Sequence, residues 1–272
     1  MFWYDINKSK GGDTLSKQIQ KLSEKLILDG LKSNGVECGV QVFSEIDSTN
    51  LEAKRQATAV HNTPMLFVAD SQTAGRGRMG RQFYSPDSTG LYMSYMYTPD
   101  CGFSDSVTVT AATAVAVVRA IKRLTDLEPE IKWVNDIYIG GKKVCGILTE
   151  AVTGKDVKII IGIGINITTE SFPKEIEGIA DSLKISVDRN RLAACIVKEL
   201  QMLISELSER TFIEEYRRLS CVLGRDVTFI KNGEEHYGQA VDIDRDGGLV
   251  VQTTDGSITL NTGEISLRVQ AD

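Results

Sequence analysis

The chain has few of the residues on which metal sites, disulfide frameworks and histidine-based catalysis depend. Its five cysteines are odd in number and scattered, and none stands in a Cys-x-x-Cys pair. They are Cys38, Cys101, Cys145, Cys195 and Cys221. This pattern argues against a disulfide framework and against a zinc site. The two histidines, His61 and His236, lie far apart and fit no metal-ligand spacing, so we expect surface or loop histidines and no histidine-based triad.

Long apolar runs and a basic surplus are also missing. No apolar stretch reaches the roughly 18 residues that a membrane-spanning helix needs. Residues 1–13 lack the charged-then-apolar layout of a signal peptide, which predicts a cytoplasmic protein without a membrane partner. The formal net charge is −6 at pH 7. Nucleic-acid binders usually carry an excess of Lys and Arg, although a local basic patch could exist within an acidic total, so we expect no nucleic-acid partner.

The spacing of apolar residues predicts a mixture of helices and strands. The predicted helices cover residues 14–31, 107–124, 189–207 and 212–219, and the predicted strands cover 40–46, 65–69, 91–97, 137–139, 143–152 and 157–167. A further helix start is predicted at residues 47–50, where Thr49 and Glu52 could form a capping box. The succession is too irregular for a doubly wound sheet, which favours an α+β class with helices packed against a mixed sheet.

The C-terminal part of the chain has a different texture. Short β-rich runs after Cys221 are separated by Asn232-Gly233, Asp246-Gly247 and Asp255-Gly256, dipeptides that favour hairpin turns. Five short strands in about 48 residues indicate a small barrel. The 272 residues thus divide into an N-terminal extension with one helix (1–38), a main domain (39–220) and a small C-terminal domain (221–272).

A loop rich in glycine and arginine occupies residues 73–82. Its centre, residues 75–81, reads Gly-Arg-Gly-Arg-Met-Gly-Arg. Glycine lets the backbone approach a ligand closely, and the arginine fork suits carboxylates and phosphates. The loop therefore suits a nucleoside triphosphate or an acyl-adenylate, although an RNA-binding segment or a plain solvated loop has the same composition. It is not a Walker loop, because Gly-x-x-x-x-Gly-Lys-Ser/Thr is absent.

Two further segments place a lysine near other polar groups. Residues 132–136, Lys-Trp-Val-Asn-Asp, hold a cation, an amide and a carboxylate. The carboxylate could bind Mg²⁺ or orient an amine, and the lysine could meet a phosphate, but Asn-Asp is also ordinary turn chemistry. In residues 141–150, Lys143 could neutralise a substrate carboxylate, and Gly146 inside the predicted strand indicates a close approach of a ligand or another backbone. A surface lysine on a hairpin is the alternative.

Isoleucine and glycine alternate over residues 161–165, and Asn166 follows them. One face of this predicted strand is therefore bulky and the other is bare, and a bare face can form the floor of a flat pocket. The motif is weak alone, because Gly-x-Gly is common and no Gly-x-Gly-x-x-Gly dinucleotide fingerprint is completed.

Taken in order, these segments resemble the biotin protein ligase family over roughly residues 40–270. The matching segments are residues 47–50 (Asp-Ser-Thr-Asn), 72–78 (Gln-Thr-Ala-Gly-Arg-Gly-Arg), 132–136, 143–150 (Lys-x-x-Gly-Ile-Leu-x-Glu) and 162–166 (Gly-Ile-Gly-Ile-Asn). The resemblance implies a class II synthetase-like catalytic domain followed by an SH3-like β-barrel. It also implies that, with Mg²⁺, the enzyme activates biotin with ATP to biotinyl-5′-AMP. The biotin then passes to a lysine on the biotin carboxyl carrier domain of a carboxylase.

The resemblance also implies roles for individual residues. In this family the Ser-Thr-Asn segment and the following glutamine contact the biotin head group, and the arginine loop closes over the biotin tail and the adenylate. The implied biotin site comprises Ser48, Thr49, Asn50, Gln72, Gly75, Arg76, Lys143, Gly146, Gly162 and Gly164. The implied ATP and adenylate site comprises Arg76, Arg78, Arg81, Lys132, Asn135 and Asn166. The implied catalytic residues are Lys143, Arg78 and Asp136, and Asp136 is also the candidate Mg²⁺ ligand.

The sequence departs from the family pattern at two places. Val134 stands where the family usually has proline, which would stiffen the turn. About 40 residues precede the Ser-Thr-Asn segment and supply one predicted helix, whereas helix-turn-helix needs at least two. Family members that also repress transcription carry a winged helix-turn-helix there, so we expect a monofunctional ligase. Family members differ in whether they form a homodimer, which leaves the oligomeric state open.

Three other functions remain as alternatives. A lipoate or octanoate ligase has the same fold, but it would need a long apolar tunnel and has no need for the Ser-Thr-Asn and glutamine set. A non-enzymatic biotin-responsive DNA repressor disagrees with the acidic total and the expected absence of a winged helix. An RNA-binding glycine/arginine module leaves the other four segments unexplained.

Overall fold

The computed structural model describes residues 20–59, 63–99, 106–231, 233–261 and 268–269. Residues 14–19 of the first predicted helix lie outside this part of the chain, as do His61, Cys101 and Asn232. Within the described ranges, no helix is both long and apolar enough to cross a membrane.

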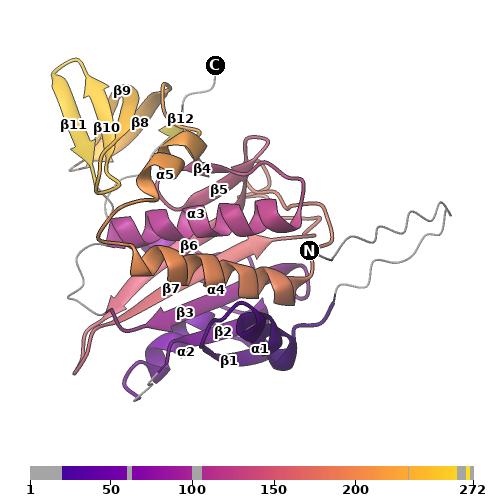
Figure 1. The fold of residues 1–272 in the computed structure, drawn as a ribbon. Coiled ribbons are helices and arrows are strands. Elements are labelled where there is room, and N and C mark those ends of the chain that lie inside the picture. The colour runs from indigo at the N-terminus through magenta and orange to yellow at the C-terminus, as the bar shows by residue number, and fades with distance from the viewer. Residues whose placement is uncertain (1–19, 60–62, 100–105, 232, 262–267, 270–272) are drawn as a thin grey trace, which may run out of the picture.

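A seven-stranded mixed sheet forms the larger part of the molecule (Figure 1). Its strand order is β1-β2-β3-β7-β6-β5-β4. The strands are β1 (Gly39–Ile46), β2 (Met65–Gln72), β3 (Gly90–Tyr97), β4 (Glu130–Lys132), β5 (Asp136–Ile139), β6 (Lys142–Val152) and β7 (Lys158–Asn166). β1 and β2 run parallel, and the other neighbouring pairs are antiparallel. The predicted α+β class with a mixed sheet is confirmed.

Different helices cover the two faces of this sheet. α3 (Ser106–Leu124) and α4 (Arg189–Ser205) lie side by side across one face, and α1 (Glu24–Ser33) packs against α4 (Figure 1). Successive side chains of a strand point to opposite faces, and the neighbours Leu66 and Phe67 belong to two separate apolar clusters. Because Phe67 clusters with Ala53 of α2 (Thr49–Gln56), α2 covers the opposite face.

A small antiparallel sheet follows α5 (Ile213–Leu219) and has the order β11-β10-β9-β8-β12. Its strands are β8 (Asp226–Lys231), β9 (Glu234–Ile243), β10 (Leu249–Thr253), β11 (Gly256–Leu260) and β12 (Arg268–Val269). Gly233 (φ +82°) and Gly247 (φ +88°) stand in its turns with the left-handed backbone that glycine adopts without a steric penalty. The predicted small β-rich C-terminal unit is therefore present.

The small sheet contacts the backbone between β4 and β5. The indole Nε1 of Trp133 donates to the carbonyl oxygen of Gly247 at 2.9 Å in a buried hydrogen bond. The hydroxyl of Tyr216 on α5 donates to the carbonyl oxygen of Val134 at 3.0 Å. The peptide bond between Trp133 and Val134 is cis. Residues of both sheets share one apolar core, so this small sheet supports the segment that carries the Lys-Trp-Val-Asn-Asp motif.

The structure corrects the start of one predicted helix and the cap of another. α1 begins at Glu24, so residues 20–23 are not helical. Ser23 caps the helix, and its own N–H is held by Asn190 Oδ1 at 2.8 Å. The predicted capping box at Thr49 and Glu52 is wrong, because Ser48 is the N-cap residue of α2. A capping box needs the N-cap N–H, and Asp47 Oδ1 already accepts from the N–H of Ser48 at 2.6 Å.

Candidate active site

The motif segments meet around one pocket of about 450 Å³, counting its open mouth. The N-terminus of α2, the end of β2 and the glycine/arginine loop form one side, and β6 and β7 form the other. Eleven predicted site residues line it: Ser48, Thr49, Asn50, Gln72, Arg76, Arg78, Asn135, Lys143, Gly146, Gly162 and Gly164. Six lining residues were not predicted: Gly77, Phe83, Met93, Ile147, Leu148 and Ile163.

Bare glycine faces form the floor of this pocket. Gly146 on β6 and Gly164 on β7 are direct cross-strand partners. A Cβ atom added to Gly164 would lie 2.5 Å from the ring of Phe83, and one added to Gly146 would lie 3.2 Å from it. The glycines therefore admit the Phe83 ring against the sheet. The sequence offers one sign of this role, which is that Phe83 is an aromatic residue directly after a polar loop.

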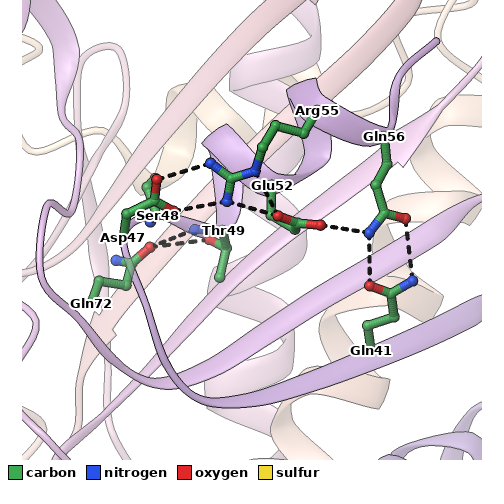
Figure 2. Close-up of polar contacts among 8 residues, drawn as sticks. All are labelled: Gln41, Asp47, Ser48, Thr49, Glu52, Arg55, Gln56 and Gln72. Atoms are coloured by element: carbon green, nitrogen blue, oxygen red, sulfur yellow. Dashed lines mark hydrogen bonds and ion pairs between the residues drawn. The ribbon is translucent and has the colours of Figure 1, made fainter.

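The residues at the start of α2 form the polar end of the pocket. The N–H of Thr49 donates to Gln72 Oε1 at 2.9 Å, and its hydroxyl lies 3.2 Å from the same oxygen (Figure 2). Gln72 Nε2 donates to Ser85 Oγ at 2.9 Å. A helix N-terminus offers free N–H groups and a partial positive charge. This end can therefore bind a neutral polar head group through several directed hydrogen bonds.

Asn50 joins this polar end to β6. Its Nδ2 donates to Glu150 Oε2 at 3.0 Å, and Glu150 Oε1 pairs with Lys54 Nζ at 2.7 Å. Burial alone would raise the pKa of Glu150, but the hydrogen bonds from Lys54 and Asn50 outweigh burial and lower it. Glu150 is therefore an ionised carboxylate behind the pocket.

A clamp on the outer side of α2 holds the turn that precedes it. The guanidinium of Arg55 contacts both carboxylate oxygens of Asp47 at 2.9 Å and pairs with Glu52 at 2.7 Å (Figure 2). This hydrogen bonding lowers the pKa of Asp47 to about 2 and raises the pKa of Arg55. The carbonyl oxygen of Asp47 accepts from the N–H of Ala74 at 2.8 Å. Asp47 thus connects α2 to the root of the glycine/arginine loop.

The other end of the pocket is cationic. Lys143 Nζ pairs with Asp136 Oδ1 at 2.6 Å. Arg78 Nη1 donates to Asn135 Oδ1 at 3.0 Å, and Asn135 Nδ2 donates to the carbonyl oxygen of Ile147 at 2.9 Å. Burial lowers the pKa of Arg78, although the nearby Asp136 opposes this shift. Two fixed cations, Lys143 and Arg78, therefore line the region where an anionic substrate group would bind.

Five predicted site residues do not line the pocket: Gly75, Arg81, Lys132, Asp136 and Asn166. Asp136 and Lys132 are cross-strand partners beside it. Lys132 Nζ lies 3.4 Å from the hydroxyl oxygen of Tyr138 and 5.2 Å from the centre of its ring. Burial lowers the pKa of Lys132, while Asp136 opposes this shift.

The other three residues lie at the edges of the site. A Cβ atom on Gly75 would meet the carbonyl oxygen of Phe83 at 2.5 Å, so the start of the loop requires glycine. Arg81 is exposed. Asn166 Nδ2 donates to the carbonyl oxygen of Asp181 at 3.1 Å, while its buried Oδ1 has no hydrogen-bond partner.

A segment after β7 also reaches the site, and no pattern in the sequence predicted it. The N–H of Lys143 donates to the carbonyl oxygen of Ile179 at 2.8 Å, and the carbonyl oxygen of Lys143 accepts from the N–H of Asp181 at 2.8 Å. These two bonds hold the backbone of Lys143 from outside the sheet.

Among the described residues, no group of three or more His, Cys, Asp or Glu could hold a metal ion. Mg²⁺ is commonly bound through one or two carboxylates together with substrate phosphates. A single carboxylate, Asp136, beside a cationic pocket fits that mode, and a dedicated protein-only metal site does not.

Comparison with known proteins agrees with this arrangement. The profile of the biotin/lipoate A/B protein ligase family matches residues 42–166, and that of the biotin protein ligase C terminal domain matches residues 222–268. The biotin protein ligase from Aquifex aeolicus, solved in complex with biotin and ATP, superposes with a TM-score of 0.76 at 29% identity. That comparison covers 85% of this chain and 99% of the other.

Two sequence relatives extend the comparison. The bifunctional ligase/repressor BirA from Bacillus spizizenii is 34% identical, over 94% of this chain and 82% of that protein. The biotin–[acetyl-CoA-carboxylase] ligase from Mycobacterium tuberculosis is 27% identical, over 83% of this chain and 88% of that protein. The chain belongs to the biotin protein ligase family.

Proposed function

We propose that this chain activates biotin with ATP to biotinyl-5′-AMP and transfers the biotin to a lysine of an acceptor protein. The observation that carries the proposal is the pocket itself, in which a hydrogen-bonding end (Thr49, Gln72) and a cationic end (Arg78, Lys143) face one cavity. Biotin has a urea ring at one end and a carboxylate at the other, so both ends find complementary groups. The similar ligase from Aquifex aeolicus was solved with biotin and ATP.

In the first half-reaction, the biotin carboxylate attacks the α-phosphorus of ATP and pyrophosphate leaves. Two anions must approach each other, so the site has to supply positive charge at fixed positions. Lys143 and Arg78 supply it within the pocket, and Arg76 adds a third cation at its lining. Lys132 and Arg81, which lie outside the lining, are the further candidates for contacts with the phosphates.

Mg²⁺ is the metal ion that we propose for this step. When bound, it would neutralise charge on the phosphates of ATP. Asp136 is the carboxylate that would hold it, because it lies beside Lys143 at the cationic end.

In the second half-reaction, the amine of the acceptor lysine attacks the carbonyl carbon of biotinyl-5′-AMP and AMP leaves. A lysine amine must lose a proton to become a nucleophile. Asp136 is our candidate for orienting or deprotonating it. The proposed acceptor is the biotin carboxyl carrier domain of a carboxylase. A cytoplasmic location, a monofunctional form and the domain limits at residues 38 and 220 stay predictions.

Exchange of radiolabelled pyrophosphate into ATP tests the proposal without any acceptor protein. We expect exchange in the presence of biotin and Mg²⁺, and none with lipoate. Exchange with lipoate alone would instead identify a lipoate ligase of the same fold. Absence of exchange with either substrate, in a folded sample, would overturn the proposed activation step.

A further inference from the structure

Three other elements hold the turn between β4 and β5. The indole of Trp133 donates to the small sheet. Asn135 forms two hydrogen bonds with Ile147 of β6, since its carbonyl oxygen accepts from the N–H of Ile147 and its Nδ2 donates to the carbonyl oxygen, each at 2.9 Å. Between these two residues, the carbonyl oxygen of Val134 accepts from the hydroxyl of Tyr216 at 3.0 Å. Tyr216 belongs to α5, which packs beside β4 (Figure 1).

The hydroxyl of Tyr216 is a permanent donor in a buried contact. Tyr216 is completely buried, and Val134 is 1% exposed. Burial raises the pKa of Tyr216, and the charge of Asp136 raises it further, so the phenol keeps its hydrogen. A buried carbonyl oxygen needs a hydrogen-bond partner. Within the described part of the chain, this hydroxyl is the partner that the carbonyl oxygen of Val134 has.

The peptide group that Tyr216 holds leads directly to Asn135. A peptide group is planar, so a fixed carbonyl oxygen on Val134 also fixes the plane that contains the nitrogen of Asn135. The Oδ1 of Asn135 accepts from Nη1 of Arg78 at 3.0 Å. Among the described residues, this is the one hydrogen bond that the side chain of Arg78 makes. The other N–H groups of the guanidinium remain available to an anionic ligand.

Arg78 needs an anchor outside its own loop. Its neighbour Met79 is 59% exposed. The backbone hydrogen bonds at this place stay within the loop: the N–H of Gly77 donates to the carbonyl oxygen of Arg81 at 2.7 Å, and the N–H of Arg81 donates to that of Arg78 at 3.2 Å. Exposed loops with few outside contacts open easily. The bond to Asn135 therefore joins the cation of the loop to the sheet.

We propose that Tyr216 is a positioning residue for the formation of the adenylate. Its hydroxyl holds the peptide group between Val134 and Asn135 in the orientation in which Asn135 directs the guanidinium of Arg78 into the pocket. Tyr216 does not line the pocket, so it acts through these residues and not on the substrate. The inference rests on the proposed function, because it takes the reaction to be the activation of biotin with ATP.

The variant Tyr216→Phe tests the proposal, because it removes the hydroxyl and keeps the ring. The carbonyl group of Val134 then has to turn toward another partner, and Arg78 loses its fixed direction. We expect the kcat of biotin-dependent pyrophosphate exchange to fall at least about tenfold, since a misplacement of about 1 Å can cost about a hundredfold. The KM for biotin should change by less than about twofold, as for a contact that acts in the transition state. An unchanged kcat would overturn the proposal.

Tyr95→Phe is the matched control, because it also removes one buried hydroxyl. Tyr95 on β3 is 1% exposed and does not line the pocket, and its hydroxyl oxygen accepts from Gln201 Nε2 of α4 at 3.0 Å. We expect both variants to lose stability in urea, and Tyr95→Phe to keep its kcat within about twofold. An equal fall of kcat in both variants would overturn the proposal and assign the effect to lost stability.

Two noncanonical residues at position 216 separate the donor from the shape of the side chain. In place of Tyr216, para-aminophenylalanine keeps an N–H donor where the hydroxyl was, whereas para-methylphenylalanine fills the same space without a donor. We expect the first to recover most of the kcat and the second to behave as Tyr216→Phe does. Equal kcat values for the two would overturn the proposal, also in the case that Tyr216→Phe does not fold.

A double-mutant cycle tests the route through Asn135. In the Asn135→Ala background, where Arg78 has already lost its partner, Tyr216→Phe should lower kcat by less than about twofold. A fully multiplicative loss would contradict the mechanism. If the unaltered chain shows no biotin-dependent exchange, the proposed function fails. If it does and Tyr216→Phe has the same kcat, only this inference fails.

Tryptic cleavage after Arg78 measures the same contact without any activity. We expect the folded Tyr216→Phe variant to be cleaved there faster than Tyr95→Phe, because its loop has lost an anchor to the sheet. Equal rates of cleavage would show that Tyr216 does not hold Arg78.

Discussion

At the scale of single residues, Lys143 is held at both its side chain and its backbone. Its Nζ pairs with Asp136 at 2.6 Å, and its backbone N–H and carbonyl oxygen bind Ile179 and Asp181 at 2.8 Å each. A charge fixed before the reaction needs no rearrangement when negative charge builds up on the phosphate. The side chain of its neighbour Lys142 makes one hydrogen bond among the described residues, to the carbonyl oxygen of Glu177 at 3.4 Å.

These two lysines form a matched pair for mutation. We expect Lys143→Ala to reduce the kcat of biotin-dependent pyrophosphate exchange by about 10²–10³-fold, because one fixed charge is lost from the transition state. Lys142→Ala should change it by less than twofold. Near-normal exchange by Lys143→Ala would remove Lys143 from the proposed mechanism.

Gly164 gives a second residue-scale prediction. The added methyl of Gly164→Ala would lie 2.5 Å from the Phe83 ring and displace it into the cavity. We expect the Kd for biotin to rise at least tenfold, since overpacking of this size costs about 1–3 kcal/mol. The double variant Gly164→Ala/Phe83→Leu should recover part of the affinity in titration calorimetry. No recovery would mean that the methyl group acts on something other than the ring.

The sequence predicted the side chains that face the ligand better than those that support them. Ser48, Thr49, Asn50 and Gln72 stand in recognisable order within motifs. Ser94 belongs to no motif, and its contact with Asn50 depends on the packing of α2 against β3, 44 residues further along the chain. Pattern and spacing within one segment carry no information about such a partner, because sheet register decides it.

At the scale of elements, α2 is held by charges at its outer side. Hydrogen bonding to Arg55 lowers the pKa of Asp47 to about 2, from an ordinary value of 3.8. A carboxyl group with a lowered pKa adds stability above its unfolded pKa and loses it as the pH falls through the folded value. Both side chains are partly exposed, so the contribution is small.

A pH series tests this contribution. The difference in Tm between the unaltered chain and Arg55→Met should stay constant from pH 7 to about pH 4 and shrink between about pH 4 and pH 2. In an Asp47→Asn background, the part of the difference that depends on Asp47 should disappear. A difference that stays constant down to pH 2 would show that Asp47 is not the group that titrates against Arg55.

Element types followed from the sequence more reliably than element ends. The apolar spacing predicted α3, α4 and the long strands. In the structure, the side chain of Asp188 caps α4. The start of α1 and the cap of α2 differ from the prediction. The N–H of Ser23 binds Asn190 and the N–H of Ser48 binds Asp47, and neither partner was expected from the local motif. β4 was not predicted, because its three residues, with a charged residue at each end, are too few to show the alternation of apolar and polar residues that identifies a strand.

At the scale of the whole molecule, the turn between β9 and β10 presses on the main domain. Gly247 in this turn accepts a hydrogen bond from Trp133, and a Cβ atom there would lie 3.2 Å from Val107 of α3. Gly233, in the turn between β8 and β9, has a similar φ but no described atom within 4 Å of such a Cβ. An alanine at either position would therefore have the same unfavourable backbone conformation, but only an alanine at Gly247 would also contact α3.

We expect Gly247→Ala to lower the free energy of unfolding by about 1 kcal/mol more than Gly233→Ala does, because only the first presses on α3. Since Trp133 adjoins the residues proposed to bind ATP, Gly247→Ala should also raise the KM for ATP. Urea unfolding and pyrophosphate exchange measure the two effects. Equal destabilisation by both variants would mean that the small sheet can move away from α3 at this contact with no loss in the free energy of unfolding.

The pocket draws its walls from residues between Ser48 and Gly164, so no short piece of the chain contains it. A molecule that touches all of these walls binds the folded chain and has no site on the unfolded one. At a concentration of about 100 times its Kd, such a ligand adds about 2.7 kcal/mol to folding. In a growing cell, the proposed ligand biotin would then slow the degradation of this protein. When biotin is scarce, the amount of the enzyme that uses it would fall.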